Sequence, residues 1–306
     1  MKPPSTLVER AAERLRDYVL DPGVSAVAPR PAPAGNKANA IPDAHFRTVS
    51  TIKLNRQRLN RVGVYSPALD ANRTTEEIRL VKQGALQRCS NAAASGLPTA
   101  PLMMVTSTRE GEGKSFISAN LALSIAAEEG RSVVLIDADP SRSAVASIFG
   151  MSRERGLLDA LSDERVQPSD ILIGTDADGF YIVPAGHPQA LSAELFASER
   201  TALFLRRLMA ECPGAYLIFD APPVLATTEA SALARQVGQI LYVVEAERIG
   251  RAEVAEALDL VSMCPNIGFV LNKVRFQFGS VRFGNYYRYY RRARRGSAGL
   301  APIRET

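Results

Sequence analysis

The strongest constraint on the fold is a regular alternation of two kinds of segment from residue 101 onward. Short apolar runs of strand length are separated by longer amphipathic runs of helix length, and the apolar runs are continuous, as in parallel strands covered on both faces. Such alternation predicts right-handed βαβ crossovers and a doubly wound, mostly parallel sheet with helices on both faces. The predicted strands span 102–106, 132–137, 180–184, 215–220, 239–244 and 267–272, and the predicted helices 114–129, 193–211, 229–236 and 251–263.

The length of 306 residues suits one α/β domain with shorter appendages. Residues 1–20 are predicted to form a helix, because a capping box is followed by apolar residues at helical spacing. Residues 21–72 are predicted to form a linker and irregular extension, since the first part is rich in proline, alanine and glycine. The α/β domain is predicted over 73–275, and a basic, tyrosine-rich tail over 276–306.

The net charge of +5 is concentrated in one segment. Between Lys273 and Arg295 there are eight basic residues and no acidic ones, so the remainder of the chain carries a net charge of −3. A mildly acidic body argues against a domain that binds nucleic acid specifically. Three well-separated cysteines without a CxxC motif, and only two histidines, argue against a disulfide framework and a zinc site.

The sequence also indicates where in the cell the protein is expected. No apolar run approaches the roughly 20 residues that cross a bilayer, and the charged N-terminal sequence is unlike a signal peptide. We therefore expect a cytoplasmic protein, whose attachment to a membrane would have to come from a partner.

The first predicted strand leads into the sequence TSTREGEGKS, and an amphipathic helix follows. Glycines let successive backbone N–H groups turn towards phosphate oxygens, and the start of the helix adds the positive end of its dipole. In such a loop Lys114 reaches the β- and γ-phosphates and the Ser115 hydroxyl ligates Mg²⁺. The loop therefore predicts a P-loop NTPase-type fold that binds ATP with Mg²⁺, and its lysine and lack of GxGxxG exclude a dinucleotide site. The predicted nucleotide-binding residues are Gly111, Glu112, Gly113, Lys114, Ser115 and Phe116.

Polar residues follow three other predicted strands, at the edge of the sheet where ligands of such folds bind. Asp137 and Asp139 end the second strand, so one carboxylate can hold Mg²⁺ and the other can accept the proton of an attacking hydroxyl. Asp220 ends the fourth strand after mostly apolar residues, as a Walker B acid does. We expect the three carboxylates to converge on one metal ion, with Lys114 completing the catalytic set. Asn272, at the end of the last strand, can hydrogen-bond an adenine edge, although asparagine is also a common turn residue.

These motifs together resemble those of the bacterial tyrosine kinases of exopolysaccharide systems, in particular the soluble autokinases associated with exosortase-type loci. GEGKSFISANLALSIA looks like their Walker A motif, VVLIDADPSR like Walker A′ and YLIFDAPPVL like Walker B, so the resemblance runs over most of the chain. It implies that Lys114 and Ser115 bind phosphate and magnesium. It further implies that Asp137 is the base or a metal ligand, with Asp139 as its metal-binding companion and Asp220 as the Walker B acid.

The resemblance also implies assembly and a partner. Glu76, Arg79 and Lys82, on a helix predicted over 74–90, match a Glu-x-x-Arg-x-x-Arg motif that packs subunits into a homo-oligomeric ring. Lysine in the last place lacks the bidentate fork of arginine, and without the family the three residues are an exposed, charge-paired helix face. Such soluble kinases need an activating cytoplasmic segment from a membrane-bound chain-length determinant protein, which would recruit the chain to the inner membrane.

Four of the nine tyrosines lie within five residues of the basic tail, at Tyr286, Tyr287, Tyr289 and Tyr290. As phosphoacceptors on a tether they could enter the active site of another subunit. Interleaved tyrosine and arginine also suit an anionic membrane or single-stranded nucleic acid, and an inert tail is a third interpretation. Each phosphotyrosine adds about −1.5 to −2 charges. Four would therefore offset the eight positive charges of the segment, which could loosen the assembly.

The leading hypothesis is an ATP-dependent protein-tyrosine autokinase that regulates exopolysaccharide polymerisation or export. The alternative is a MinD/ParA-like ATPase switch that positions a partner without phosphorylating protein, and a third possibility is a scaffold that binds ATP without turnover. The partitioning and septum-positioning ATPases carry a second lysine where this chain has Arg109. That difference and the tyrosine cluster favour the kinase, and the full set of Lys114, Ser115 and three aspartates disfavours the scaffold.

Overall fold

The structure is a computed structural model that describes residues 46–64, 73–152 and 154–274. The chain divides into two compact units between Asn272 and Lys273, and the fold is that of the first unit. The predicted N-terminal helix over 1–20 and the tyrosine-rich tail lie outside the described residues. Among the described residues, no helix is long and apolar enough to cross a membrane.

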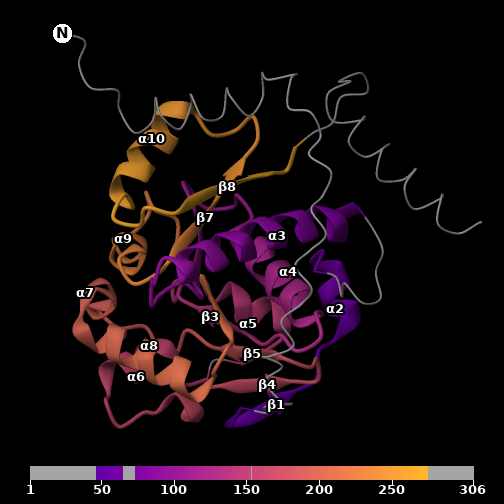
Figure 1. Cartoon of the computed structure of the whole chain (residues 1–306), viewed down its shortest axis with the longest axis vertical. Coiled ribbons are helices and arrows are strands. Elements are labelled where there is room, and N and C mark those ends of the chain that lie inside the picture. Colours follow the sequence, from indigo (N-terminus) through magenta and orange to yellow (C-terminus); the bar gives the residue numbers. More distant parts are fainter. Residues whose placement is uncertain (1–45, 65–72, 153, 275–306) are drawn as a thin grey trace, which may run out of the picture. The chain divides into compact units, whose positions relative to one another are not determined.

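An eight-stranded sheet organises the described part of the chain, with the strand order β1-β4-β5-β3-β6-β2-β7-β8 (Figure 1). Every neighbouring pair is parallel except β4 and β5, which confirms the predicted mostly parallel, doubly wound sheet. The six predicted strands are present to within one residue at each end. The strands are β1 (Ser50–Ile52), β2 (Leu102–Ser107), β3 (Val133–Asp137), β4 (Ile173–Thr175), β5 (Phe180–Val183), β6 (Tyr216–Asp220), β7 (Gln239–Glu245) and β8 (Ile267–Asn272).

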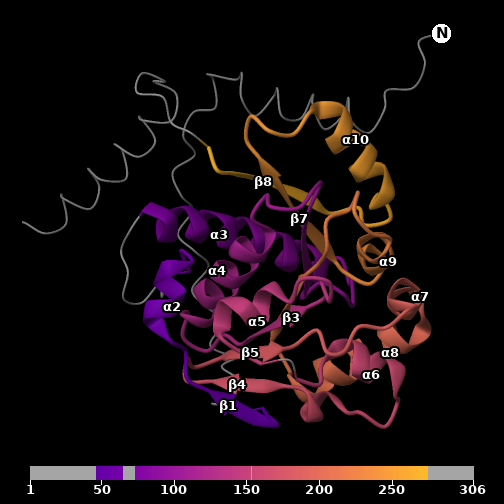
Figure 2. The same ribbon diagram turned by 180° about the vertical axis from the view of Figure 1, so that it is seen from behind.

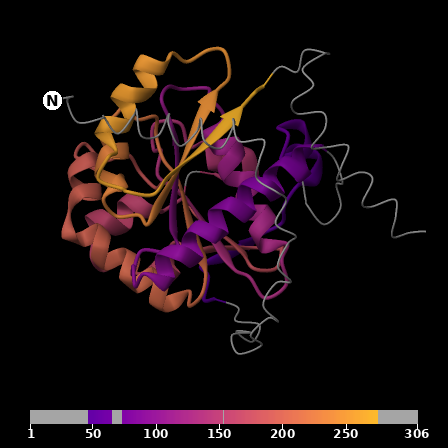
Figure 3. The ribbon, with the colours of Figure 1, turned by 45° about the horizontal axis from the view of Figure 1, so that its top comes forward.

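Helices cover both faces of this sheet and bury one hydrophobic core on each side (Figures 1 and 2). Leucine, isoleucine and valine from β2, β3 and β6 point alternately into the two cores, which explains why these strands are apolar throughout. One face carries α2 (Arg56–Arg61), α3 (Arg73–Ala94), α4 (Lys114–Ala126) and α5 (Ala144–Phe149). The other carries α6 (Leu157–Ser162), α7 (Ser192–Ala197), α8 (Glu199–Glu211), α9 (Glu229–Ala234) and α10 (Arg251–Leu260). Figure 3 shows the strands between these two helical layers.

The helix predicted over 193–211 is wrong in one respect, because two helices occupy this range. Ser198 has an extended backbone, with φ −78° and ψ 161°, and separates α7 from α8. The carbonyl of Leu195 accepts hydrogen bonds from the hydroxyls of Ser198 and Thr201, each at 2.7 Å. The Leu195 carbonyl also accepts a hydrogen bond from the backbone N–H of Ser198 at 3.1 Å, so it is fully paired at the break and the break costs little.

The predicted irregular extension over 21–72 also needs correction, because residues 46–64 are folded onto the sheet. β1 pairs in parallel with β4, and the Phe46 ring is buried against Tyr181, with ring centroids 4.8 Å apart. In α2, the Arg58 guanidinium donates hydrogen bonds of 3.0 and 2.7 Å to the carbonyl oxygen of Ser147. A three-residue strand and a polar six-residue helix are too short to give a periodic signal, and tertiary contacts fix them instead.

Candidate nucleotide-binding site

The loop between β2 and α4 has the backbone that a phosphate-binding loop requires. Gly111 and Gly113 have φ of 82° and 100°, in the left-handed region that favours glycine. At Gly113 a Cβ atom would lie 2.1 Å from Nδ2 of Asn272, so any side chain there would displace the Asn272 amide. α4 begins at Lys114, and the positive end of a 13-residue helix therefore points at the space that the loop encloses.

Glu112 was predicted to bind nucleotide as part of the loop, and its side chain also forms hydrogen bonds that hold the loop in place. Its side chain is fully buried, and one carboxylate oxygen accepts a hydrogen bond from the Arg109 backbone N–H at 2.5 Å. The other oxygen accepts from the backbone N–H of Glu245, at the end of β7, at 3.1 Å. Glu112 therefore closes the loop on itself and fastens it to the neighbouring strand, a role that the loop motif did not predict.

Asn272 holds the same loop from β8. Its side-chain Nδ2 donates a hydrogen bond of 2.8 Å to the carbonyl oxygen of Glu112. The side chain thus contacts the loop backbone directly, which sequence reasoning missed because the two residues are 160 positions apart. The predicted contact of Asn272 with adenine stays a prediction.

The loop lysine lies among the carboxylates that follow the strands. Nζ of Lys114 is 2.7 Å from Oδ2 of Asp139, and the lysine is only 7% exposed. Burial by itself lowers the pKa of Lys114, but the neighbouring carboxylates Asp220, Asp139 and Asp137 raise it by a larger amount. The ammonium is therefore charged, and it can neutralise phosphate in a site largely shielded from water.

Asp137 and Asp220 are cross-strand partners at the ends of β3 and β6. Burial, and then the charge of Asp220, raises the pKa of Asp137 to about 8. Burial also raises the pKa of Asp220, against the opposing effects of Lys114 and of hydrogen bonds from Ser115 and Ser118. Within the described residues, Oδ2 of each aspartate is buried and has no partner with hydrogen-bond geometry. Two carboxylate oxygens are thus available for an incoming cation at one point of the site.

The expectation that three carboxylates converge on one metal ion is corrected by the position of Asp139. Its Oδ2 pairs with Lys114 and its Oδ1 accepts a hydrogen bond of 2.5 Å from the Ser141 hydroxyl. Across the described ranges, no three histidine, cysteine or acidic side chains are arranged to hold a metal ion together. Asp139 therefore positions the loop lysine, because both of its oxygens are already engaged.

Phe116, one of the predicted nucleotide-binding residues, directs its ring towards the N-terminal segment. A Cβ atom at Gly63 would lie 3.1 Å from this ring, so the ring covers the turn that ends α2. The neighbouring Asn120 donates a hydrogen bond of 3.4 Å to the carbonyl oxygen of Gly63. Residues 46–64 therefore brace the first turns of α4 directly behind the phosphate loop.

The predicted interface residues on α3 do not behave alike. Arg79 and Glu76 form an ion pair one turn apart on a partly exposed helix face, and their role between subunits stays a prediction. Lys82 is buried instead, and its Nζ lies 3.0 Å from the Ser124 carbonyl oxygen and 2.5 Å from a carboxylate oxygen of Glu128. The prediction that Lys82 faces a neighbouring subunit is wrong, because its ammonium joins α3 to the end of α4.

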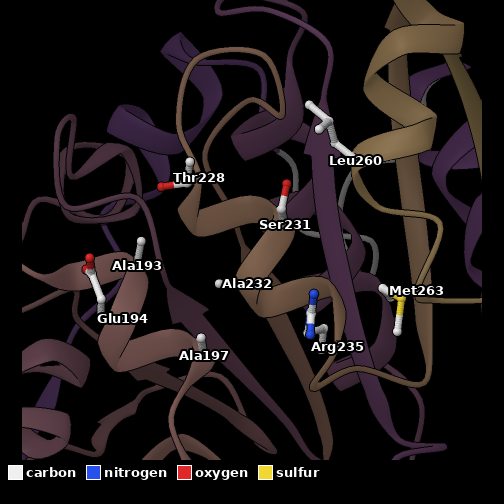
Figure 4. A pocket seen from close by; sticks show the side chains of 9 residues that line it. All are labelled: Ala193, Glu194, Ala197, Thr228, Ser231, Ala232, Arg235, Leu260 and Met263. Carbon is white, nitrogen blue, oxygen red and sulfur yellow. The ribbon is translucent and has the colours of Figure 1, made fainter.

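A surface cavity of about 410 Å³ lies elsewhere, between α7, α9 and α10 (Figure 4). Alanines of α7 and α9 line it, together with Leu260 and Met263. The described residues around it include no member of the predicted site. The nucleotide chemistry therefore belongs to the edge of the sheet and not to this cavity.

Fold and site together define a P-loop nucleotide-binding domain. The family model of the CobQ/CobB/MinD/ParA nucleotide binding domain matches residues 103–304. The tyrosine-protein kinase CpsD of Streptococcus agalactiae is 30% identical, over 63% of this chain and 83% of CpsD. EpsB of Ralstonia solanacearum is 30% identical over 72% of this chain, but the match spans only 28% of EpsB.

Solved structures agree on the fold. The kinase domain of the Escherichia coli tyrosine kinase ETK superposes with a TM-score of 0.58 at 23% identity, over 76% of this chain and 94% of that domain. The chain therefore belongs to the CobQ/CobB/MinD/ParA nucleotide-binding domain family and to the bacterial tyrosine-protein kinases. This membership confirms the resemblance to the bacterial tyrosine kinases, and the narrower likeness to the autokinases of exosortase-type loci stays a prediction.

Proposed function

We propose that this protein is an ATP-dependent protein-tyrosine autokinase that phosphorylates the tyrosine cluster of its own C-terminal tail. The observation that carries the proposal is the cluster of Lys114 with Asp137 and Asp220, in which one buried cation faces two carboxylates with available oxygens. Phosphoryl transfer needs this combination, because catalysis consists of positioning the phosphates and neutralising their charge.

The residues fit a magnesium ion bound together with a nucleotide. Mg²⁺ prefers oxygen ligands and is usually held by one or two carboxylates, with water and phosphate oxygens completing its shell. Oδ2 of Asp137, Oδ2 of Asp220 and the Ser115 hydroxyl beside Asp220 would supply the protein ligands. When bound, the ion would offset the negative charge that repels an attacking oxygen.

The reaction follows from the groups around this point. The tyrosine oxygen forms a bond to the γ-phosphorus, the bond from that phosphorus to the β–γ bridging oxygen breaks, and ADP leaves. Lys114 holds the β- and γ-phosphates, and Asp139 keeps its ammonium in position. Asp137 would receive the phenolic proton, because an ionised carboxylate at this point can act as the general base.

The acceptors in this proposal are Tyr286, Tyr287, Tyr289 and Tyr290. They follow the last strand of the sheet within 18 residues of Asn272, on a segment with many arginines. A tether this short favours the active site of a second subunit, so transfer is expected in trans within a homo-oligomeric ring. Glu76 and Arg79 are the candidate interface residues on α3.

The cellular role that we propose is regulation of exopolysaccharide polymerisation or export. CpsD, with which this chain shares 30% identity, is a tyrosine-protein kinase, and this likeness supports the proposal. An activating cytoplasmic segment from a membrane-bound chain-length determinant protein would bring the kinase to the inner membrane. The body of the chain, with its net charge of −3, gives no reason to expect nucleic acid as a partner.

A mixing experiment tests the kinase proposal. One chain carries Lys114→Met and therefore has acceptors without a working site, whereas the other has Phe at all four tail tyrosines and a working site without acceptors. After incubation with Mg-ATP, with and without the activating partner, mass spectrometry should place phosphate on the Lys114→Met chain. Each chain incubated alone is the control and should stay unlabelled.

The second candidate is a MinD/ParA-like ATPase switch, because the family whose model matches this chain includes MinD and ParA. A switch would hydrolyse ATP and leave both chains of the mixture without phosphotyrosine. Absence of label, with both chains folded and ATP consumed by the chain that lacks acceptors, would favour the switch over the kinase.

A further inference from the structure

A histidine and an aspartate form a hydrogen-bonded pair outside the nucleotide cluster. Nδ1 of His187 is 2.9 Å from Oδ1 of Asp159, and the His187 side chain is 57% exposed whereas that of Asp159 is 16% exposed. The other oxygen of Asp159 accepts hydrogen bonds from the backbone N–H groups of Gly156, at 2.9 Å, and of His187, at 3.1 Å. The Asp159 carboxylate therefore takes part in three hydrogen bonds. The imidazole of His187 is held in place by one of them and is otherwise largely exposed to solvent.

The loop that carries His187 does not need the imidazole to keep its shape. The first two backbone N–H groups of α6 donate to the carbonyl oxygens of Pro184 and Ala185, at 2.8 and 3.0 Å. Gly186 has a φ of 85°, and a Cβ there would lie 2.4 Å from Oδ2 of Asp159. Backbone donors and a glycine therefore bring the loop against Asp159. The exposed imidazole of His187 is not needed to hold the loop in this position.

The pair lies at the same edge of the sheet as the phosphate site. β5 and β3 are parallel neighbours, with Val183 opposite Ile136, so both strands end where the chain reaches Asp137. His187 follows four residues after Val183. Neighbouring strands are about 4.8 Å apart and each further residue adds at most about 3.5 Å, so the Cα of His187 lies within about 19 Å of that of Ile136, the residue before Asp137.

The hydrogen bond to Asp159 selects the tautomer of the ring. In the neutral imidazole Nδ1 carries the hydrogen that is donated to the carboxylate, and Nε2 is left with a lone pair. Nε2 is therefore a hydrogen-bond acceptor on the exposed edge of the ring. A phenolic hydroxyl is a donor that matches it.

We propose that His187 is an acceptor-positioning residue, whose Nε2 accepts a hydrogen bond from a tyrosine of the tail that lies next to the reacting one. The inference rests on the proposed kinase function. With Tyr286 at the phosphate, Tyr289 and Tyr290 lie three and four residues further along the same tail. An extended chain covers about 10 to 14 Å over that span, which lies within this upper limit. The clustering of four tyrosines in five residues thereby gains a physical reason: one reacts while another anchors.

The test compares two replacements of the ring in the full chain whose four tail tyrosines are changed to Phe, with a peptide of residues 284–295 as acceptor. His187→Phe keeps a planar ring but has no acceptor nitrogen, whereas His187→Gln keeps an acceptor oxygen. His187→Phe should raise the KM for the peptide about 2- to 10-fold, as expected for one lost hydrogen bond. The kcat, the KM for ATP and the melting temperature should not change, and His187→Gln should stay close to the parent chain.

A binding measurement separates this inference from the proposed function. The affinity of the peptide for the same three chains is measured by calorimetry without nucleotide, so the result does not depend on turnover. Weaker binding of the peptide to the His187→Phe chain, but not to the His187→Gln chain, supports the inference. If no phosphorylation is observed in addition, only the kinase proposal fails. Equal affinity of all three chains, or equal loss in both variants, overturns the positioning role of His187.

Discussion

Asp137 and Asp220 lie directly opposite each other on β3 and β6, at the last residue of each strand. Among the described residues, each has one buried carboxylate oxygen without a hydrogen-bond partner. Two adjacent buried carboxylates repel each other, so both are costly to keep ionised without a cation between or beside them. We therefore expect both aspartates to contribute to Mg²⁺ binding, and the stability of the metal-free protein to depend on pH.

Metal dependence should separate the two kinds of aspartate. Asp137→Asn and Asp220→Asn each remove a proposed ligand, so the Mg²⁺ concentration that gives half-maximal activity should rise and turnover should fall by about 10²-fold or more. Asp139→Asn instead loosens the 2.7 Å contact with Lys114, so it should weaken nucleotide binding with a smaller change in Mg²⁺ dependence. Initial rates of tail phosphorylation measured against Mg²⁺ concentration distinguish the cases. Identical Mg²⁺ curves for all three variants and the parent chain would contradict the assignment.

Stability should depend on pH through Asp137 when metal and nucleotide are removed. The folded state raises the pKa of Asp137 to about 8, through burial and the charge of Asp220, whereas the unfolded state leaves it near about 3.9. Between these values the folded state binds the extra proton, so the free energy of unfolding falls as the pH rises from about 4 towards 8. Urea unfolding in EDTA at pH 6 and pH 8.5 should show this loss.

The variant Asp137→Asn provides the control for that measurement, because its amide does not titrate. The difference in unfolding free energy between the two pH values should be smaller in the variant than in the parent chain. Mg²⁺ with ATP should restore stability to the parent chain at pH 8.5, since the pair of carboxylates is then ionised and bound. A parent chain as stable at pH 8.5 as at pH 6, in EDTA, would contradict a pKa of about 8 for Asp137.

Lys82 should matter for folding and not for assembly. Burial raises the pKa of Glu128, but the hydrogen bond and charge of Lys82, together with Arg131, lower it by more, so the Lys82–Glu128 pair is ionised. Lys82→Met leaves the Ser124 carbonyl without its ammonium and Glu128 with Arg131 as its remaining cation, and it should cost about 1–3 kcal/mol of unfolding free energy. Arg79→Ala, on the partly exposed face of the same helix, should cost about 0–1 kcal/mol and shift the proposed ring towards smaller species in sedimentation. A larger loss of stability for Arg79→Ala, together with smaller species for Lys82→Met, would instead indicate that Lys82 lies at the interface between subunits.

Local sequence patterns predicted the central part of the fold well. Six strands were located to within one residue, because parallel strands buried on both faces are continuous apolar runs that differ sharply from their flanks. β1 and β4 were missed, since three residues with threonine or glycine among them carry no such contrast. Residues 46–64 owe their structure to contacts with Tyr181 and Ser147, which no local pattern contains.

In the candidate site, too, some features were predicted from local sequence patterns and others were not. The phosphate loop and the strand-end acids were predicted because their spacing is local and their edge of the sheet follows from topology. The buried position of Lys82 depends on Ser124, 42 residues away, and a helical pattern cannot distinguish a solvated lysine from one with such a partner. The bracing of the loop by Glu112 and Asn272 likewise joins residues 133 and 160 positions apart.

The contact between Gly113 and Asn272 yields a prediction in two steps. Gly113→Ala adds a Cβ that would lie 2.1 Å from Nδ2 of Asn272, and it places alanine at a φ of 100°, so nucleotide binding should be lost. Asn272→Ala removes only the 2.8 Å hydrogen bond to the Glu112 carbonyl, so it should weaken nucleotide binding by a smaller factor, about 2- to 10-fold. The double variant relieves the clash but not the backbone strain, which costs alanine about 1–2 kcal/mol. It should therefore bind nucleotide better than Gly113→Ala and worse than Asn272→Ala, as measured with a fluorescent ATP analogue. Binding by Gly113→Ala equal to that of the parent chain would mean that the loop does not have this conformation.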